Sequence, residues 1–189
     1  MNLLRTVITM SMLTLLAACR SSHPPLTTEP VVDLPRFMGD WYVIASIPTF
    51  MEKGAHNAVE SYRLDLDGTI ATTFTFRKDA FEGELKRHCP RGFVLDTRSN
   101  AVWGMRFVWP IKADYRIVHV SPDYQRTIVG REKRDYVWIM ARTPSIDDAQ
   151  LAELRERVAR EGYDLSALQV VPQRWPEGDA ARSNLEECS

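Results

Sequence analysis

Hydrophobic and polar residues alternate in short stretches from Gly39 onward, and turn residues separate one stretch from the next. The stretches recur about every 10 to 15 residues, which is typical of an all-β domain. A period of two places alternate side chains on opposite faces of a β-strand. The pattern predicts eight strands, at residues 40–48, 57–66, 69–77, 82–95, 101–109, 114–120, 125–132 and 135–142.

Residues between and within these stretches indicate where the chain turns or bends. Asp67-Gly68 separates the second stretch from the third, and this dipeptide is a strong signal for a β-hairpin. Pro90 and Gly92 interrupt the fourth stretch, which is therefore predicted to be bent, bulged or partly loop. Near the end of the chain, Val170-Val171 predicts a short ninth strand.

The period of the pattern changes after residue 144. Leu151 and Leu154 stand three residues apart, with charged residues around them. This spacing predicts an amphipathic helix at residues 147–161. Ser145 is the expected N-cap, and Gly162 is expected to end the helix.

An open sheet of eight antiparallel strands would expose two long edges, and closing the sheet removes them. The predicted fold is therefore all-β, an eight-stranded antiparallel up-and-down β-barrel with one C-terminal α-helix packed outside. A barrel of this size is either filled by side chains or holds one small ligand. Nine apolar or aromatic residues are expected to face inward and to contact such a ligand: Phe74, Phe76, Trp103, Met105, Phe107, Trp109, Tyr136, Trp138 and Met140.

The N-terminus is typical of a secreted lipoprotein. Residues 6–16 form an uncharged, mostly apolar run of eleven residues, whereas a membrane span needs roughly 20. Residues 1–18 are therefore predicted to be a signal peptide. The run ends in Leu16-Ala17-Ala18-Cys19, which resembles the bacterial lipobox and implies a diacylglyceryl group on Cys19. The alternative is ordinary cleavage nearby, which would leave Cys19 as a free thiol.

Residues 19–35 are polar and rich in proline, without periodicity. They are predicted to be an extended tether that holds the domain some 30 Å or more from the bilayer. Arg20 stands where an Asp would retain an enteric lipoprotein in the inner membrane. The resemblance to lipoproteins therefore favours an outer-membrane location with the protein facing the periplasm.

Three short motifs in order resemble those of the lipocalin family. Gly39-Asp40-Trp41-Tyr42 matches the G-x-W-Y motif, and Asp123-Tyr124 lies where lipocalins carry a T-D-Y-type motif, with Pro122 in place of Thr. Arg142 ends the eighth predicted strand, just before the helix, where the third motif has a basic residue. The resemblance is nearest to bacterial outer-membrane lipocalins of the apolipoprotein D type. It implies a lipocalin domain at residues 36–175 and a tail at 176–189.

The resemblance assigns structural roles to the motif residues. Trp41 is expected to plug the closed end of the barrel, with the Arg142 guanidinium over its indole ring. Cys89 and Cys188 are expected to form a disulfide, which an oxidising periplasm and the habit of lipocalins both favour. The alternative is a free Cys89 thiol facing the cavity, as in the few lipocalins that are enzymes of the isomerase type.

Charge and motif content exclude several other functions. The net charge of −1 argues against nucleic-acid binding. The four histidines lack metal-ligand spacing, and the sequence has no nucleotide-binding or hydrolase motif. Residues 131–135 (REKRD) are interpreted as a solvated turn. Glu60 shares a strand face with Tyr62, but a position at the rim or on the surface is preferred for it.

These observations predict a non-catalytic lipid-binding protein without cofactor or metal. The resemblance implies fatty acids or lysophospholipids as ligands, a role in envelope maintenance, and a membrane contact through the N-terminal lipid. Burying an acyl chain is worth about 0.8 kcal/mol per methylene before the costs of binding. The protein is expected to be a monomer or a weak homodimer. The alternatives are a barrel filled by its own aromatic side chains and the thiol enzyme.

Overall fold

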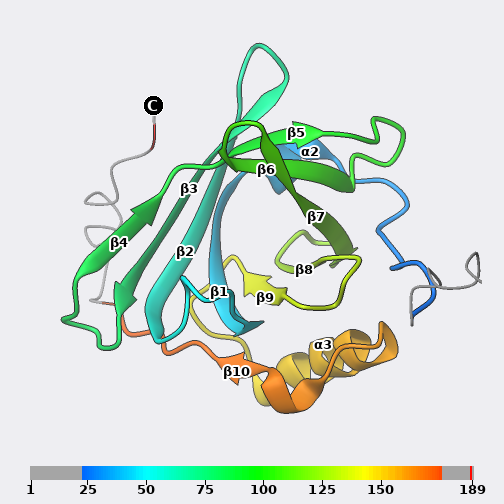
Figure 1. Cartoon of the computed structure of the whole chain (residues 1–189). Coiled ribbons are helices and arrows are strands. Elements are labelled where there is room, and N and C mark those ends of the chain that lie inside the picture. Colours follow the sequence, from blue (N-terminus) through cyan, green and yellow to red (C-terminus); the bar gives the residue numbers. More distant parts are fainter. Residues whose placement is uncertain (1–22, 176–187, 189) are drawn as a thin grey trace, which may run out of the picture.

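The computed structural model describes residues 23–175 and Cys188, and its main feature is a closed antiparallel β-barrel (Figure 1). The signal peptide, Cys19 and most of the C-terminal tail lie outside the described residues. The strands are β1 (Gly39–Ile47), β2 (Ala55–Leu64), β3 (Thr69–Lys78), β4 (Leu85–His88), β5 (Arg91–Val94), β6 (Val102–Val108), β7 (Ile111–Val120), β8 (Arg126–Gly130), β9 (Val137–Ala141) and β10 (Gln169–Val170).

The predicted eight-stranded barrel is confirmed. Neighbouring strands pair in sequence order, and β1 also pairs with β9, which closes the sheet. β4 and β5 together make the predicted fourth strand, since both pair with β3 and only β5 pairs with β6. The break falls at Pro90, which has no backbone N–H to donate to the ladder. The short ninth strand is β10, which pairs with β1.

The predicted helix is α3 (Asp148–Arg160), which packs outside the barrel (Figure 1). The expectation of Ser145 as its N-cap is wrong. The Asp147 side chain accepts a hydrogen bond from the backbone N–H of Gln150, whose own side chain accepts one from the Asp147 N–H. This capping box satisfies two otherwise unpaired donors at the helix start.

Two hydrophobic clusters stabilise the fold, one on each side of the barrel wall. The inner cluster fills the closed half of the barrel and includes Trp41, Trp103 and Met140. The outer cluster lies between the barrel and α3 and includes Leu154 and Val158. The alternation of each strand places its apolar residues on one of these two sides.

In its described part, residues 23–35, the predicted tether packs against the barrel instead of extending away from it. Its Leu26 and Val32 side chains are buried, and the Val32 N–H donates to the carbonyl of Ser99 at 2.7 Å. Before β1 the chain also makes one short helix that the pattern did not predict, α2 (Leu34–Phe37), whose N-cap is Asp33. Because apolar side chains interrupt its polar run, residues 24–33 pack along the barrel.

Within the described part of the chain, no helix is both long and apolar enough to cross a bilayer.

Candidate ligand-binding site

One end of the barrel is closed around Trp41 and Arg142. The Arg142 guanidinium lies 3.7 Å from the centroid of the Trp41 ring. It donates hydrogen bonds to the carbonyls of Asp40 at 2.7 Å and of Met38 at 2.8 Å. Burial lowers the pKa of Arg142 to about 10, so the side chain stays charged at neutral pH. The guanidinium therefore joins the first strand, the α2 segment and the last strand.

The other motif residues complete this closed end. Gly39 has φ +89°, a left-handed backbone conformation that favours glycine. Asp123 accepts a hydrogen bond from the Ser121 hydroxyl in the turn between β7 and β8. The Tyr124 hydroxyl accepts one from the Asp33 N–H at 2.9 Å. All five motif residues therefore hold the closed end and lie outside the cavity lining.

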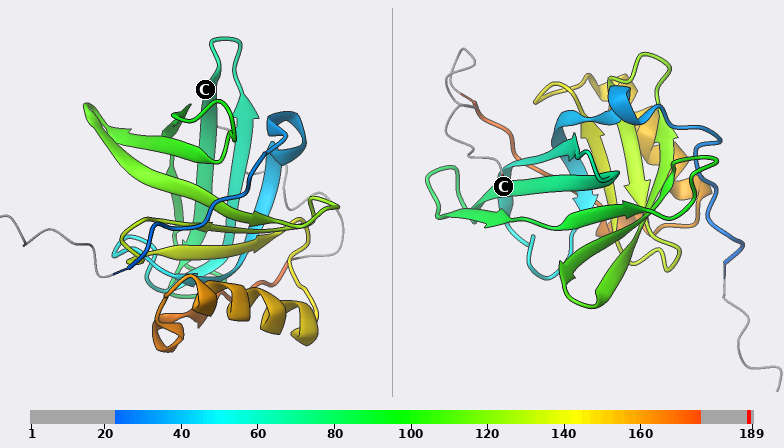
Figure 2. Two further views of the ribbon diagram at one scale, coloured as in Figure 1. Left: turned by 90° about the vertical axis from the view of Figure 1, so that its right-hand side faces the viewer. Right: turned by 90° about the horizontal axis from the view of Figure 1, so that it is seen from above.

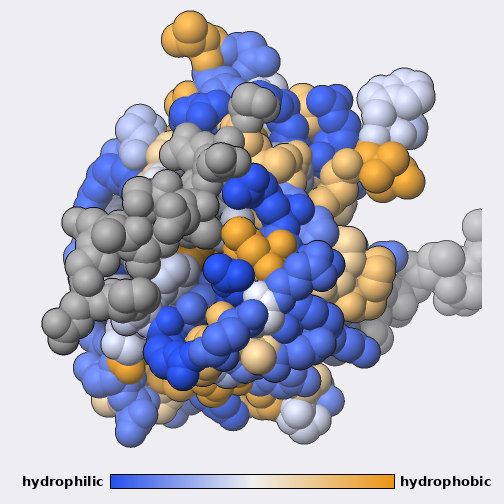
Figure 3. Space-filling model, turned by 90° about the vertical axis from the view of Figure 1, so that its left-hand side faces the viewer, coloured by the Kyte–Doolittle hydropathy of each residue, from blue (hydrophilic) through white to orange (hydrophobic). Residues whose placement is uncertain are grey.

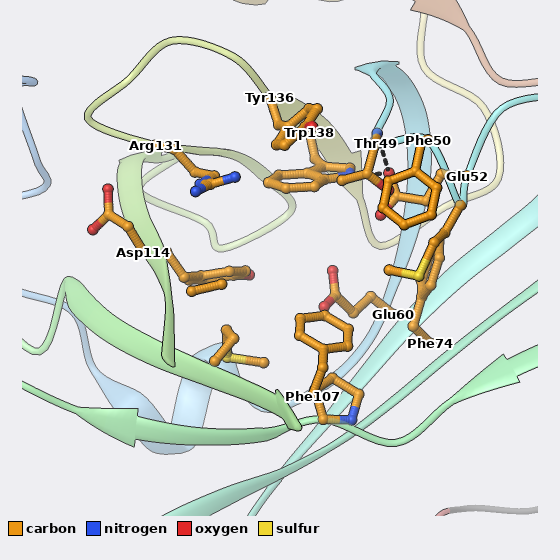
Figure 4. Close-up of a pocket in the computed structure, with 15 residues that line it drawn as sticks. Thr49, Phe50, Glu52, Glu60, Phe74, Phe107, Asp114, Arg131, Tyr136 and Trp138 are labelled. Atoms are coloured by element: carbon orange, nitrogen blue, oxygen red, sulfur yellow. Dashed lines mark hydrogen bonds between the residues drawn. The ribbon is translucent and has the colours of Figure 1, made fainter. Parts of the chain in front are cut away.

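The opposite end of the barrel opens into a cavity of about 210 Å³ (Figure 4). Its lining includes residues of the β1–β2 and β8–β9 loops and of the β6–β7 hairpin strands. Most of its lining is apolar. The lining residues are Thr49, Phe50, Met51, Glu52, Glu60, Phe74, Pro90, Met105, Phe107, Ala113, Asp114, Tyr115, Arg131, Tyr136 and Trp138.

Five of the nine residues expected to contact a ligand line this cavity: Phe74, Met105, Phe107, Tyr136 and Trp138. Phe76, Trp103 and Met140 face inward but are fully buried in the core cluster. The Trp103 ring stacks on Tyr115 at 5.2 Å between ring centroids, and its indole N–H donates to the carbonyl of Asn100. The alternative of a filled barrel is thus realised only beneath the cavity, around Trp103 and Met140.

Trp109 departs from the face predicted for it. Its side chain is 78% exposed and lies outside the cavity lining. The pairing of β6 with β7 shifts register between Met105 and Val108, and β6 ends at Val108. A bulge breaks the period of two, so residues after it no longer share the face of Trp103.

Glu60 lies inside the barrel, contrary to the preferred rim or surface position. Its carboxyl points into the cavity near Phe74 (Figure 4). Burial raises its pKa to about 8. A hydrogen bond with Tyr62 lowers the pKa in part, and the charge of Glu52 raises it further. Tyr62 in turn is hydrogen-bonded to Tyr115, and burial raises the pKa of both tyrosines. The strand face that Glu60 shares with buried Tyr62 was the available signal.

A second carboxyl, that of Glu52, lies near the mouth. It accepts hydrogen bonds from the Trp138 indole N–H at 3.0 Å and from the Thr49 backbone N–H at 3.2 Å (Figure 4). Burial raises its pKa. No hydrophobic pattern marks a loop acid of this kind, so the sequence offered no signal for it.

The interpretation of residues 131–135 as a solvated turn is wrong for two of its arginines. Arg131 lines the cavity, and its Nε is buried without a hydrogen-bond partner among the described residues. Arg134 is buried and donates to the carbonyls of Glu132, Glu161 and Pro24. The N-terminal segment and the region after α3 cover this loop, and their packing is a tertiary effect.

Cys89 and Cys188 form a disulfide in the structure. Neither residue lines the cavity. The alternative of a cavity thiol acting as a nucleophile therefore lacks its nucleophile. Among the residues that the structure describes, no group of three His, Cys, Asp or Glu side chains is arranged to hold a metal ion.

Comparison with known proteins agrees with the β-barrel, its closed end around Trp41 and Arg142, and the cavity at its other end. The family model for the lipocalin-like domain matches residues 32–173. The chain belongs to the lipocalin family. It is 32% identical to temperature-induced lipocalin-1 of Arabidopsis thaliana over 154 residues, which cover 75% of this chain and 80% of that protein.

A bacterial lipocalin matches nearly end to end. The chain is 28% identical to the outer membrane lipoprotein Blc of Escherichia coli (strain K12) over 175 residues, covering 92% of this chain and 98% of that one. Among solved structures, insecticyanin from the tobacco hornworm superposes with a TM-score of 0.63 at 13% identity, covering 86% of this chain and 90% of that one. This lipocalin is thus a Blc-related ligand-binding protein with the expected fold.

Proposed function

We propose that this lipocalin is a lipid-anchored protein of the outer membrane that binds fatty acids or lysophospholipids and carries them in the periplasm for envelope maintenance. The single observation that supports the ligand class is the pairing of an apolar cavity with one guanidinium. Arg131 reaches into the cavity from the β8–β9 loop (Figure 4). Its Nε has no partner among the described residues, and leaving a buried donor unpaired costs free energy.

A carboxylate or phosphate head group would satisfy that donor. The guanidinium holds one ion pair, to Asp135 at 3.3 Å, and stands 5.2 Å from the Tyr136 ring centroid. Charge-assisted bonds from arginine to such anions are among the stronger hydrogen bonds in proteins. The acyl chain would then extend inward past Phe107 and Phe74, where each buried methylene contributes about 0.8 kcal/mol.

The size of the cavity favours single-chain lipids. Its volume of about 210 Å³ is below the roughly 300–1,000 Å³ of common ligand pockets. Trp103 and Met140 fill the barrel beneath it. One acyl chain is therefore expected to enter in part, with the head group at the mouth, while a two-chain phospholipid is not expected to fit.

Titration of purified protein with a lysophospholipid, followed by intrinsic fluorescence and calorimetry, tests this function. Arg131→Gln should weaken binding about tenfold or more, because a charge-assisted bond is worth about 1.5–3 kcal/mol. Lys133→Gln is the matched control, since Lys133 is an exposed cation of the same loop outside the lining. Wild-type protein that binds neither a lysophospholipid nor a fatty acid would refute the proposal.

The anchor is tested separately. Cys19→Ser should leave the protein outside the membrane fraction after a high-salt wash, because the described chain has no helix that could hold it there. The match to an outer membrane lipoprotein, which extends over 92% of the chain, supports this part of the proposal. Retention of the variant in membranes would contradict it.

A further inference from the structure

The β6–β7 hairpin ends in an exposed apolar tip, residues 107–111, at the mouth of the cavity. Val108, Trp109 and Ile111 are 70%, 78% and 71% exposed. Phe107 is half exposed and also lines the cavity. Large apolar side chains gathered on one loop of a soluble domain mark a surface that contacts lipid or protein.

This tip stands away from the barrel wall. β5 pairs with β6 only as far as Arg91 opposite Arg106, and β4 pairs with β3 alone. The hairpin therefore continues past the sheet, at the upper left of the left panel of Figure 2. Orange and pale side chains project at the upper right of Figure 3, where this hairpin lies. The hairpin therefore projects beside the opening of the cavity.

The charged residues that flank the tip are both basic. Arg106 and Lys112 stand on either side of it, and the seven residues 106–112 contain no acid. Both cations lie over the Phe93 ring, at 4.7 and 3.9 Å from its centroid. Aromatic and aliphatic side chains between basic residues suit the boundary between the acyl chains and the anionic head groups of a bilayer.

The course of the N-terminal segment brings the anchor to the same end of the molecule. From the closed end at Val32 the segment runs back along the barrel, and the Leu26 N–H donates to the Glu132 carboxylate in the β8–β9 loop. The carbonyl of Pro24 accepts a bond from Arg134 in the same loop. Both panels of Figure 2 show the segment reaching the side on which the hairpin tip projects.

The chain between Pro24 and Cys19 is too short to let the closed end face the membrane. Four residues lie between them, so the five steps from Cys19 to Pro24 span at most about 18 Å. The ten residues of β7 are about 33 Å long. A lipid on Cys19 therefore holds the mouth end of the barrel close to the bilayer.

We propose that the tip, residues 107–111, inserts into the surface of the bilayer that carries the protein's own lipid, so that the cavity opens directly onto that membrane. Phe107 would then lie both in the lipid surface and in the cavity lining, and a single-chain lipid could pass between them along one apolar side chain. This inference rests on the proposed lipid anchor and lipid ligand.

The test places an environment-sensitive NBD dye at either end of the barrel in the intact lipidated protein. Ile111→Cys carries the dye at the tip, and Leu66→Cys carries it in the β2–β3 turn, where the side chain is equally apolar and fully exposed. The protein is reconstituted in vesicles of phosphatidylethanolamine and phosphatidylglycerol. The dye at residue 111 should brighten several-fold and be quenched by brominated acyl chains, while the dye at residue 66 should show neither effect.

Other occupants of the tip give other results. Iodide quenching of the dye at residue 111 in vesicles would show a tip in water and overturn the proposal. Protection from both iodide and brominated lipid would show a protein surface or a second copy on the tip, and would overturn it as well. Val108→Cys provides a second probe position should the first variant fold poorly.

A rate measurement connects the tip to function. The double variant Trp109→Ser/Ile111→Ser should slow transfer of a lysophospholipid from vesicles about tenfold or more, with its affinity in solution unchanged. Leu66→Ser should leave the rate unchanged, and equal rates for all three proteins would refute the proposal. A protein that binds no lysophospholipid would fail the proposed function, while the dye at residue 111 would still decide whether the tip inserts.

Discussion

Glu60 should make the stability of this lipocalin depend on pH in a direction opposite to that of most carboxyls. Burial raises its pKa from 4.5 to about 8. Between these values the unfolded chain has released the proton and the folded chain retains it. The free energy of unfolding therefore falls as pH rises from about 4.5 to 8, and the Glu60 contribution is constant above that range.

The magnitude follows from the size of the shift. Each pKa unit corresponds to about 1.4 kcal/mol, so the full shift is worth about 5 kcal/mol. Because the carboxyl faces a cavity that water can enter, about 2–4 kcal/mol is the expected effect. Glu60→Gln keeps the shape and the hydrogen bonding to Tyr62 but removes the charge. The variant should match wild type near pH 4 and exceed its stability by about 2–4 kcal/mol near pH 9.

Denaturant unfolding followed by tryptophan fluorescence at pH 4, 6, 8 and 9 measures this difference. Groups that do not interact with Glu60 cancel when the two curves are subtracted, whereas Glu52, Tyr62 and Tyr115 interact with its charge and contribute to the difference. Glu156→Gln, which removes an exposed acid of α3, is the control and should follow wild type throughout. A constant difference between Glu60→Gln and wild type from pH 4 to 9 would refute the burial of Glu60 in a low-dielectric site.

Three further changes test other parts of the structure. Arg142→Lys keeps the charge, but an ammonium group cannot contact several carbonyls and the Trp41 ring as the planar guanidinium does. The variant should lower the free energy of unfolding by about 2–3 kcal/mol in denaturant titrations, and an unchanged midpoint would contradict this. Phe107→Asp puts a charge in the cavity lining and should weaken lysophospholipid binding about tenfold in calorimetry. Val108→Asp, at a neighbouring residue outside the lining, should leave binding unchanged, and equal effects of the two substitutions would show that Phe107 does not contact the ligand. The Cys89→Ser/Cys188→Ser variant should lose stability, by less than the roughly 4.7 kcal/mol of a free 100-residue loop, because residual structure in the unfolded chain reduces the entropic gain. Full alkylation of both cysteines in the oxidised wild type would mean that the bond is absent.

The sequence by itself determined the barrel and its closed end. A period of two is set by the backbone, so apolar alternation located the strands to within a few residues, and the switch of period after residue 144 located α3. Because unpaired sheet edges are unfavourable, eight strands were expected to close into a barrel. The G-x-W-Y motif and Arg142 could be recognised because their roles depend on backbone positions that the fold always brings together.

Only the tertiary structure decided which side chains reach the cavity. Alternation gives the face of a side chain but not its depth, so it could not separate Trp103 in the core from Met105 in the lining. A register shift in β6 moved Trp109 to the surface, and such bulges depend on the pairing with β7.

The polar residues of the cavity and the path of the N-terminus were also decided by tertiary contacts. Arg131 and Arg134 look like a solvated charge run, yet Arg131 lines the cavity and Arg134 is covered by segments that are distant in sequence. Residues 24–33 look like a tether, yet Leu26 and Val32 find apolar surface and backbone partners on the barrel. A charged or proline-rich segment carries no local sign of such partners, because its burial depends on surfaces that exist only once the barrel has formed.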